Sequence, residues 1–305
     1  MFYEIFFCSL ICISNDLFST YAEYVMINAI IAEQLHCEIN NFTCYRNASF
    51  ENVVIAQKEA GKMLTTLNLL ELFETWVPVI DHNLIHGQPL DLIFNVSFPL
   101  KPLMIGTVTE EGIAFVYGAW SKPLSTSLYL EALFLGFPEH VLKLIELYPP
   151  DGSDDQRLVL SKIVTDWIFA CSTRIYAQKS PSYMYAFGYP PDFDGWSLSR
   201  YCKGHVCHGD ELPYLFESAW YNITDAGRRV SQHMATYWTN FAKTRDPNRP
   251  VPVPIPWPIL NENKSYIYLQ DPIELRENYQ KEYCDFWDTI GYKHNFITIK
   301  KRFLS

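Results

Sequence analysis

Val206-Cys207-His208-Gly209-Asp210-Glu211-Leu212-Pro213-Tyr214-Leu215-Phe216 places a histidine on a glycine-containing turn, directly before an apolar, helix-like segment. Upstream lies the apolar strand-like run Tyr183-Met184-Tyr185-Ala186-Phe187, followed by a loop rich in Pro, Gly and Asp. An α/β enzyme presents a catalytic imidazole in this way, on a loop beyond the carboxyl end of a strand. No Gly-x-Ser-x-Gly motif occurs in the 305 residues, so the nucleophile that such a histidine usually serves is absent from this sequence.

Composition and charge narrow the class of protein. The chain has 305 residues, of which 49% are apolar and 16% aromatic, so it can build a sizeable core as one large or two small domains. Its net charge of −10 and the lack of a basic stripe exclude a nucleic-acid surface. We interpret residues 291–305 as a solvated basic tail. No apolar run is long enough to span a membrane.

Cysteines and glycosylation motifs indicate the cellular compartment. The sequence has eight cysteines, an even number. It also has five Asn-x-Ser/Thr motifs, which begin at Asn41, Asn47, Asn95, Asn222 and Asn263. Together they predict a secreted glycoprotein that folds in an oxidising compartment.

Residues 1–24 do not fit the pattern of the rest. Phe2 to Ile13 is mostly apolar, like the core of a signal peptide, but Glu4 lies inside it and no Lys or Arg precedes it. The segment is therefore a weak signal peptide, a helix, or sequence that does not belong to the adjoining domain. Cys8 and Cys12 lie in this segment, and we assign them no partner.

Strands and helices alternate along the chain. Hydrophobic patterns predict strands at 103–108, 183–187 and 266–269. They predict helices at 21–37, 52–72, 113–117, 125–178 with a break at 149–152, 225–243 and 283–290. This order favours an α/β fold with a mostly parallel sheet flanked by helices. The strands are few for the length, so we expect the chain to form only part of a sheet.

Glu111 is the natural partner of His208. It follows the strand 103–108, as His208 follows the strand 183–187, and the acid precedes the histidine in the chain. In α/β-hydrolases the order is Ser, then Asp or Glu, then His. A carboxylate accepts a hydrogen bond from one imidazole N–H, fixes the tautomer and leaves the other nitrogen as a base.

The chain resembles type-B carboxylesterases and cholinesterases from about residue 25 to residue 290. Pro102–Gly112 is similar to their acid-bearing segment, and Val206–Phe216 to their histidine segment. The segments similar to the family's C-terminal signature are Tyr237–Thr244, Asp246-Pro247-Asn248 and Pro256-Trp257-Pro258. The motifs occur in the family's order, and the resemblance implies the C-terminal portion of an α/β-hydrolase fold, incomplete on its N-terminal side.

The resemblance also implies a function and its residues. The family's acid falls on Glu111 and not Glu110, and its histidine on His208 and not His205. The implied activity is hydrolysis of a small carboxylic ester through an acyl-enzyme, with no cofactor and no metal. The family's oxyanion-hole loop and Gly-x-Ser-x-Gly elbow are expected before residue 25 and are absent there, so the 305 residues alone should be inactive. Family members often pair through C-terminal helices, which makes a homodimer an expectation.

Two positions depart from the family pattern. Arg245 stands where Gly is usual before Asp-Pro-Asn, and His82 stands where Gly is usual after Asp81. Both are expected in loops, so they affect local detail more than the assignment.

The cysteines around the histidine allow two interpretations. Cys202, His205, Cys207 and His208 are four candidate zinc ligands, but their spacing is more crowded than loop-separated ligand pairs. A disulfide between Cys202 and Cys207 that braces the loop is favoured instead. The resemblance further implies a Cys37–Cys44 and a Cys171–Cys284 disulfide.

Three hypotheses follow. The chain is the C-terminal part of a secreted carboxylesterase, a non-catalytic cholinesterase-like protein that binds a partner, or a product that cannot fold alone because an apolar sheet edge is open. Retention of both Glu111 and His208 argues mildly for the first.

Overall fold

The computed structural model describes residues 21–63, 78–95, 101–193, 200–260 and 263–292. Within these ranges the chain forms two compact units, residues 21–92 and residues 93–292, with the boundary inside helix α4 (Pro89–Phe94). The predicted N-terminal segment 1–24 and tail 291–305 lie for the most part outside the described residues. Cys8 and Cys12 lie outside them as well.

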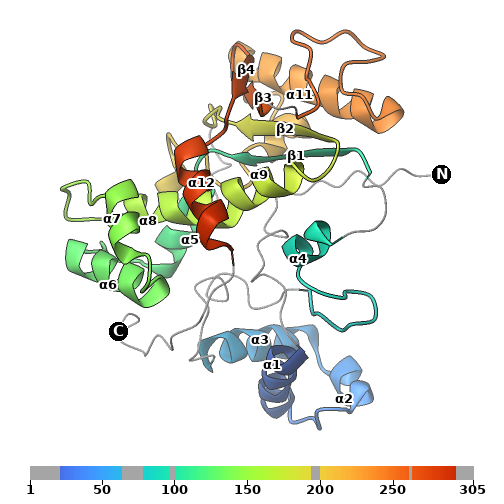
Figure 1. Ribbon diagram of the computed structural model, residues 1–305. Helices are drawn as coiled ribbons and strands as arrows, with labels where there is room; N and C mark the ends of the chain where they lie inside the picture. Colours follow the sequence, from blue (N-terminus) through green and yellow to red (C-terminus); the bar gives the residue numbers. More distant parts are fainter. Residues whose placement is uncertain (1–20, 64–77, 96–100, 194–199, 261–262, 293–305) are drawn as a thin grey trace. The chain divides into compact units, whose positions relative to one another are not determined.

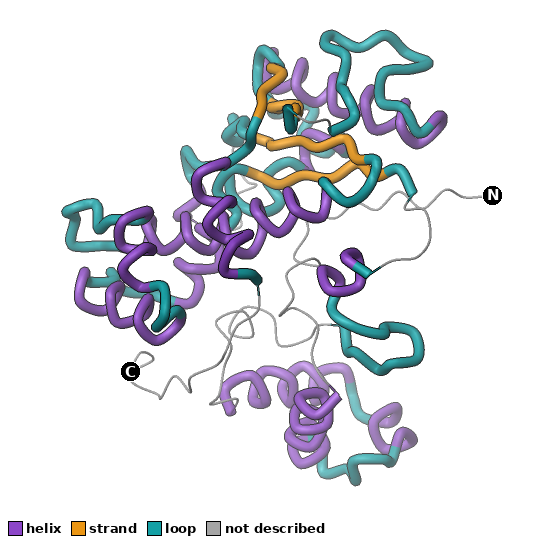
Figure 2. Tube along the Cα trace, viewed as in Figure 1, coloured by secondary structure: helices purple, strands orange, loops and turns teal. Residues whose placement is uncertain are grey.

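The larger unit is built on a four-stranded sheet (Figures 1 and 2). Its strands are β1 (Leu103–Val108), β2 (Ser182–Phe187), β3 (Ser265–Leu269) and β4 (Glu274–Glu277), in that spatial order. β1, β2 and β3 are parallel, and β4 is antiparallel to β3. The prediction of a mostly parallel α/β sheet with flanking helices is confirmed.

Burial explains why β1 and β2 could be predicted from continuous apolar runs. All six residues of β2 are buried, and successive side chains point to opposite faces. Tyr185 and Phe187 pack in a core with Val230 and Met234 of α11 (Asp225–Thr244). Helix α9 (Cys171–Ala177) also packs on β1 and β2. Figure 1 shows the strands running between α11 and the pair formed by α9 and α12 (Lys281–Ile290). Both faces are thus covered, as parallel strands require.

The segment between β1 and β2 is helical, as predicted, with the break at 149–152 between α7 and α8. Its elements are α5 (Gly112–Ala119), α6 (Thr126–Gly136), α7 (Val141–Leu147), α8 (Arg157–Val164), the π-helical turn η2 (Thr165–Ala170) and α9. Helix α5 packs against α8, and α12 packs against α9 and η2. Between β2 and α11 the chain forms the short helices η3 (Arg200–Cys202) and α10 (Leu212–Leu215).

The short elements that were not predicted include one strand and two helices. Strand β4 has the sequence Glu-Leu-Arg-Glu, in which half-buried and exposed residues alternate, so it shows no apolar run. Helix α4 lies in the Pro-punctuated segment 78–102, and α2 (Phe42–Asn47) begins inside the expected 37–44 loop. Short elements such as these carry too few periodic positions to be recognised.

The smaller unit is helical. Helix α1 (Tyr21–Gln34) packs against α3 (Phe50–Met63), and α2 lies between them in sequence. The side chain of Asn41 caps α2 by accepting a hydrogen bond from the Cys44 N–H at 3.1 Å. The predicted helix 52–72 is described only as far as residue 63, and its remainder lies outside the described residues.

The two departures from the family's glycines share a backbone conformation. Arg245 ends α11 with φ of 63°, and His82 has φ of 56°, so both are left-handed. Glycine adopts this conformation without the steric cost that a side chain brings. The family pattern therefore has glycine where the chain turns left-handed, and this sequence carries a strained residue at each place.

Candidate active site

Glu111 is held at the junction of β1 and α5. Its side chain is 0% exposed, and Oε1 accepts a hydrogen bond from the Val108 N–H at 2.9 Å. The next residue, Gly112, donates its N–H to Thr165 Oγ1 at 2.9 Å. A Cβ at Gly112 would lie 2.2 Å from the Ser161 carbonyl oxygen, so only glycine permits α5 to approach α8 this closely. The backbone around the acid is thereby fixed on both sides.

The histidine loop is closed by its own residues. Gly209 has φ of 88°, which lets the chain turn directly after His208. Asp210 accepts a hydrogen bond from the Cys207 N–H at 2.6 Å and donates its own N–H to the Cys207 carbonyl at 3.0 Å. A disulfide between Cys202 and Cys207 braces the same loop. These contacts present the imidazole on a tight turn immediately before α10.

The structure brings Glu111 and His208 together. Glu111 Oε2 lies 2.6 Å from His208 Nδ1, although the residues are 97 positions apart in sequence. The imidazole is 24% exposed, whereas the carboxylate is fully buried. A buried acceptor at Nδ1 places the proton there and leaves Nε2 as the nitrogen that takes a proton. This arrangement suits general-base catalysis by a histidine with a carboxylate partner.

Two phenylalanines form an apolar wall beside the imidazole. The ring centroid of His208 lies 5.1 Å from that of Phe115 and 5.5 Å from that of Phe169. Phe115 and Phe169 are themselves stacked at 5.5 Å. The wall limits rotation of the imidazole and lowers the local polarity, which strengthens its hydrogen bond to Glu111. These two residues could not be predicted from the sequence, because nothing in their spacing indicates proximity to His208.

A second acid–histidine contact lies next to the first. His205 Nδ1 is 2.7 Å from Glu110 Oε1, and Glu110 Oε2 accepts from the Val206 N–H at 2.8 Å. The Glu110 N–H in turn donates to the Val206 carbonyl at 3.1 Å. His205 and Glu110 are about one-third exposed, so this pair is much wetter than the Glu111–His208 pair. Its geometry fixes the histidine loop to the acid loop.

Glu211 is a third acid of the site, and it was not predicted from the sequence. It is 3% exposed, and its Oε2 has no hydrogen-bond partner among the described residues. Burial, together with the charge of Glu111, raises its pKa to about 7, whereas His208 opposes the shift. Glu211 is thus protonated over most of the acidic range and adds no second negative charge beside Glu111.

Replacing Glu211 by Gln is expected to remove a pH dependence of stability. With a pKa raised from 4.5 to about 7, the folded protein binds more protons than the unfolded one in this range. Stability therefore falls as pH rises from about 4.5 to 7, by on the order of 3 kcal/mol. Glu211→Gln mimics the neutral acid and should flatten this decline in urea unfolding curves. The matched control Glu217→Gln removes an exposed carboxyl nearby and should keep it; equal curves for the two variants would contradict the assignment.

The six cysteines in the described part of the chain are joined in three pairs. Disulfides connect Cys202 with Cys207, and also Cys37 with Cys44 and Cys171 with Cys284. Since Cys202 and Cys207 bond to each other, they supply no thiolate for the zinc site that was considered. Among the described residues, no group of three or more His, Cys, Asp or Glu is arranged to hold a metal ion.

The five predicted glycosylation positions all lie on the surface. Their asparagines are exposed in both units: Asn41, Asn47, Asn95, Asn222 and Asn263. In the part of the chain that the structure describes, no helix combines the length and the apolar character needed to cross a membrane.

Comparison with known proteins identifies the family. The carboxylesterase family model matches residues 18–287, which is most of the chain. The chain therefore belongs to the carboxylesterase family, in agreement with the resemblance seen in its motifs and with the α/β sheet.

Individual relatives are considerably longer. The chain is 30% identical over 276 residues to the cAMP-regulated D2 protein of Dictyostelium discoideum, covering 86% of this chain and 51% of that protein. It is 26% identical over 302 residues to neuroligin-2 of Rattus norvegicus, covering 84% of this chain and 36% of the relative. Identity to carboxylesterase 5A of Felis catus is 25%, over 69% of this chain and 42% of that protein. The chain thus spans about half the length, or less, of these relatives.

Proposed function

We propose that this chain supplies the acid and the histidine of a carboxylic ester hydrolase, with Glu111 orienting His208 as the general base. The observation that carries the proposal is the 2.6 Å contact between Glu111 Oε2 and His208 Nδ1, made by a fully buried carboxylate. A solvated pair on the surface would have little orienting power, because water competes for both partners.

The proposed reaction needs a nucleophile from sequence outside these 305 residues. In the serine hydrolase mechanism, His208 Nε2 takes the proton of a serine hydroxyl as the serine attacks the ester carbonyl. The imidazolium, stabilised by Glu111, then gives this proton to the leaving alcohol, and water releases the acid from the acyl-enzyme in a second cycle. The substrate class is a small carboxylic ester, and neither a metal nor a cofactor takes part.

Secretion is part of the proposal. Three disulfides and five exposed Asn-x-Ser/Thr asparagines support passage through an oxidising, glycosylating compartment. We also propose that the family portion is one domain, with the N-terminal segment and basic tail lying outside it. A homodimer remains a further proposal, which sedimentation of the native protein would test.

The first experiment is the intact mass of the endogenous protein before and after removal of N-linked glycans, with peptide mapping. We expect a deglycosylated mass well above 35.5 kDa, a Gly-x-Ser-x-Gly peptide, and labelling of that serine by a fluorophosphonate probe. A mass loss on deglycosylation would support secretion independently of the activity. A deglycosylated mass at or below 35.5 kDa without labelling would contradict the hydrolase proposal.

The alternative is a non-catalytic member of the family that binds a protein partner. The absence of Gly-x-Ser-x-Gly from the 305 residues favours it. If the endogenous protein is not labelled by the serine probe, its ectodomain should bind a cell surface, and His208→Ala should leave that binding unchanged.

A further inference from the structure

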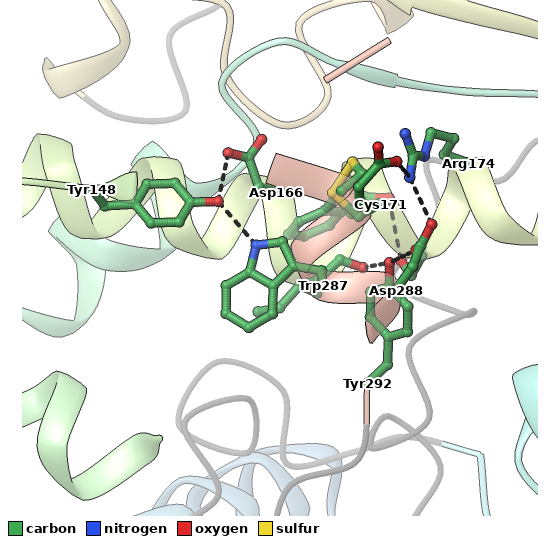
Figure 3. The surroundings of a disulfide bond; sticks show 12 residues. Tyr148, Asp166, Cys171, Arg174, Trp287, Asp288 and Tyr292 are labelled. Atoms are coloured by element: carbon green, nitrogen blue, oxygen red, sulfur yellow. Dashed lines mark hydrogen bonds and ion pairs between the residues drawn. A yellow bond between two sulfur atoms is a disulfide. The ribbon is translucent and has the colours of Figure 1, made fainter. Parts of the chain in front are cut away.

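Helix α12 is joined to the helices beside it by a disulfide and an ion-pair cluster (Figure 3). The disulfide links Cys284 of α12 to Cys171 of α9. Arg174 Nη2, also on α9, lies 2.9 Å from Asp285 Oδ1 and 2.6 Å from Asp288 Oδ2. The disulfide and the two ion pairs all join α12 to α9.

A third connection passes through a buried hydrogen-bonded chain. The Trp287 indole N–H of α12 donates to the Tyr148 hydroxyl at 2.9 Å, and that hydroxyl donates to Asp166 Oδ2 at 3.1 Å. Figure 3 shows the Tyr148 hydroxyl pointing toward Asp166 and Trp287, with both hydrogen bonds meeting at its oxygen. None of the three is more than 2% exposed. This series of hydrogen bonds therefore ends at the carboxyl group of Asp166, which water does not reach.

Asp166 has no cation to balance a negative charge. Its Oδ1 has no hydrogen-bond partner, and no Lys or Arg forms an ion pair with it among the described residues. A buried carboxylate without a paired cation is costly, so the group takes up a proton instead. Consistent with this, burial raises the pKa of Asp166 to about 7, against the smaller opposing effects of the Tyr148 hydrogen bond and of Lys162.

The groups that face Asp166 do not supply the missing charge. From the end of α7 comes the Tyr148 hydroxyl, and from α12 the indole of Trp287 behind it. Lys162 of α8 acts on Asp166 only electrostatically, since its ammonium is bonded to the Tyr283 hydroxyl at 2.8 Å. Tyr279, just before α12, is buried and neutral; its pKa is raised by burial and, in addition, by the charge of Asp166. The surroundings are neutral at hydrogen-bond distance.

We propose that Asp166, Tyr148 and Trp287 form a pH-sensitive latch: α12 stays closed while Asp166 is a neutral acid, and ionisation of Asp166 favours opening of α12, because opening lets water reach the buried carboxylate. The folded form keeps the Asp166 proton to higher pH than the unfolded form does. Stability from this latch is thus complete below about pH 4 and is lost as pH rises to about 7. Because the folded form binds one extra proton within that range, the folding equilibrium constant falls up to tenfold for each unit by which the pH rises. The latch would make α12 firmest in a mildly acidic compartment.

The test compares the full chain with its Asp166→Asn variant. Hydrogen exchange should show α12 amide protection factors that fall as pH rises from about 5 to 8 in the wild type and are much flatter in Asp166→Asn. Infrared titration provides a second measurement that does not depend on the variant's stability. The wild type should retain a protonated-carboxyl band above pH 6, and isotopic labelling of aspartate should shift it.

Asp285→Asn is the matched control on the same helix. The pKa of Asp285 is lowered by Lys281 and Arg174, which outweigh its partial burial, so its loss should weaken α12 without flattening the pH response. Asp166→Asn protection that declines with pH as steeply as in the wild type would overturn the proposal. Infrared evidence that all buried aspartates are ionised at pH 5 would do so too. Both readouts use the chain alone and are independent of ester hydrolysis.

Discussion

Replacing Glu111 by Gln is expected to lower kcat of the native hydrolase by about four orders of magnitude. The amide oxygen of Gln can still accept from the Val108 N–H, which leaves the amide NH2 facing His208 Nδ1. An amide N–H and an imidazole N–H cannot hydrogen-bond to each other. The imidazole therefore loses its hydrogen at Nδ1 and adopts the tautomer with hydrogen on Nε2. That nitrogen then cannot take the proton of a nucleophile, although the shape of the site is preserved.

The matched variant is Glu110→Gln, one position earlier. Glu110 contacts His205 and the Val206 N–H, and the oxygen of Gln can keep the second of these contacts. The Glu110→Gln variant should lose at most about tenfold in activity, which corresponds to the free energy of one ordinary hydrogen bond. Nitrogen NMR of His208 gives a readout that needs no nucleophile: hydrogen should move from Nδ1 to Nε2 in Glu111→Gln only. Unchanged kcat in Glu111→Gln would remove Glu111 from the proposed mechanism.

Removing the Cys171–Cys284 disulfide by double substitution to Ser is expected to cost up to about 5 kcal/mol of stability. The cysteines are 113 residues apart, so the bridge restricts a long loop of the unfolded chain. It also fixes α12 next to α9, where the ion pairs of Arg174 and the latch of Trp287 depend on it. Urea unfolding would report the loss as a lower midpoint.

The Cys202–Cys207 disulfide serves as the control for loop length. Its cysteines are five residues apart, so the same entropic argument gives a loss of only about 2 kcal/mol. The two double variants should therefore differ clearly in midpoint, with the short bridge affecting mainly the histidine loop. Equal losses would show that local strain, and not restriction of the unfolded chain, dominates the contribution of these bridges.

The elements that could be predicted from sequence are those whose own residues indicate burial, through a continuous apolar run or an apolar helix face. The run 103–108 was predicted to the residue, and 183–187 to within one, because strands buried on both faces must be apolar throughout. Helix α11 was predicted from its apolar face to within one residue of its end. Strand β4 was not predicted because it is an edge strand that pairs only with β3. Side chains on an edge strand need not be apolar, so the sequence shows no apolar run.

The site divides along the same line. Glu111 and His208 could be proposed because each follows a strand and lies in a family motif. Glu211 and Asp166 could not, because a carboxyl becomes unusual only when other segments exclude water and cations from it. The phenylalanine wall likewise depends on how α5 and η2 pack. Sequence thus indicates which residues carry chemistry, whereas the tertiary fold determines the state in which they carry it.

The two consecutive acids bind the two histidines of the facing loop in the same order, Glu110 with His205 and Glu111 with His208. The two loops are therefore held together by two acid–histidine contacts side by side. One residue inserted or deleted between His205 and His208 would change the spacing of the two histidines, so that both contacts could no longer form together. Repositioning the histidine would therefore require both loops to be rebuilt together. Changes of loop length before Cys202, outside the segment that holds the histidines, would be far better tolerated.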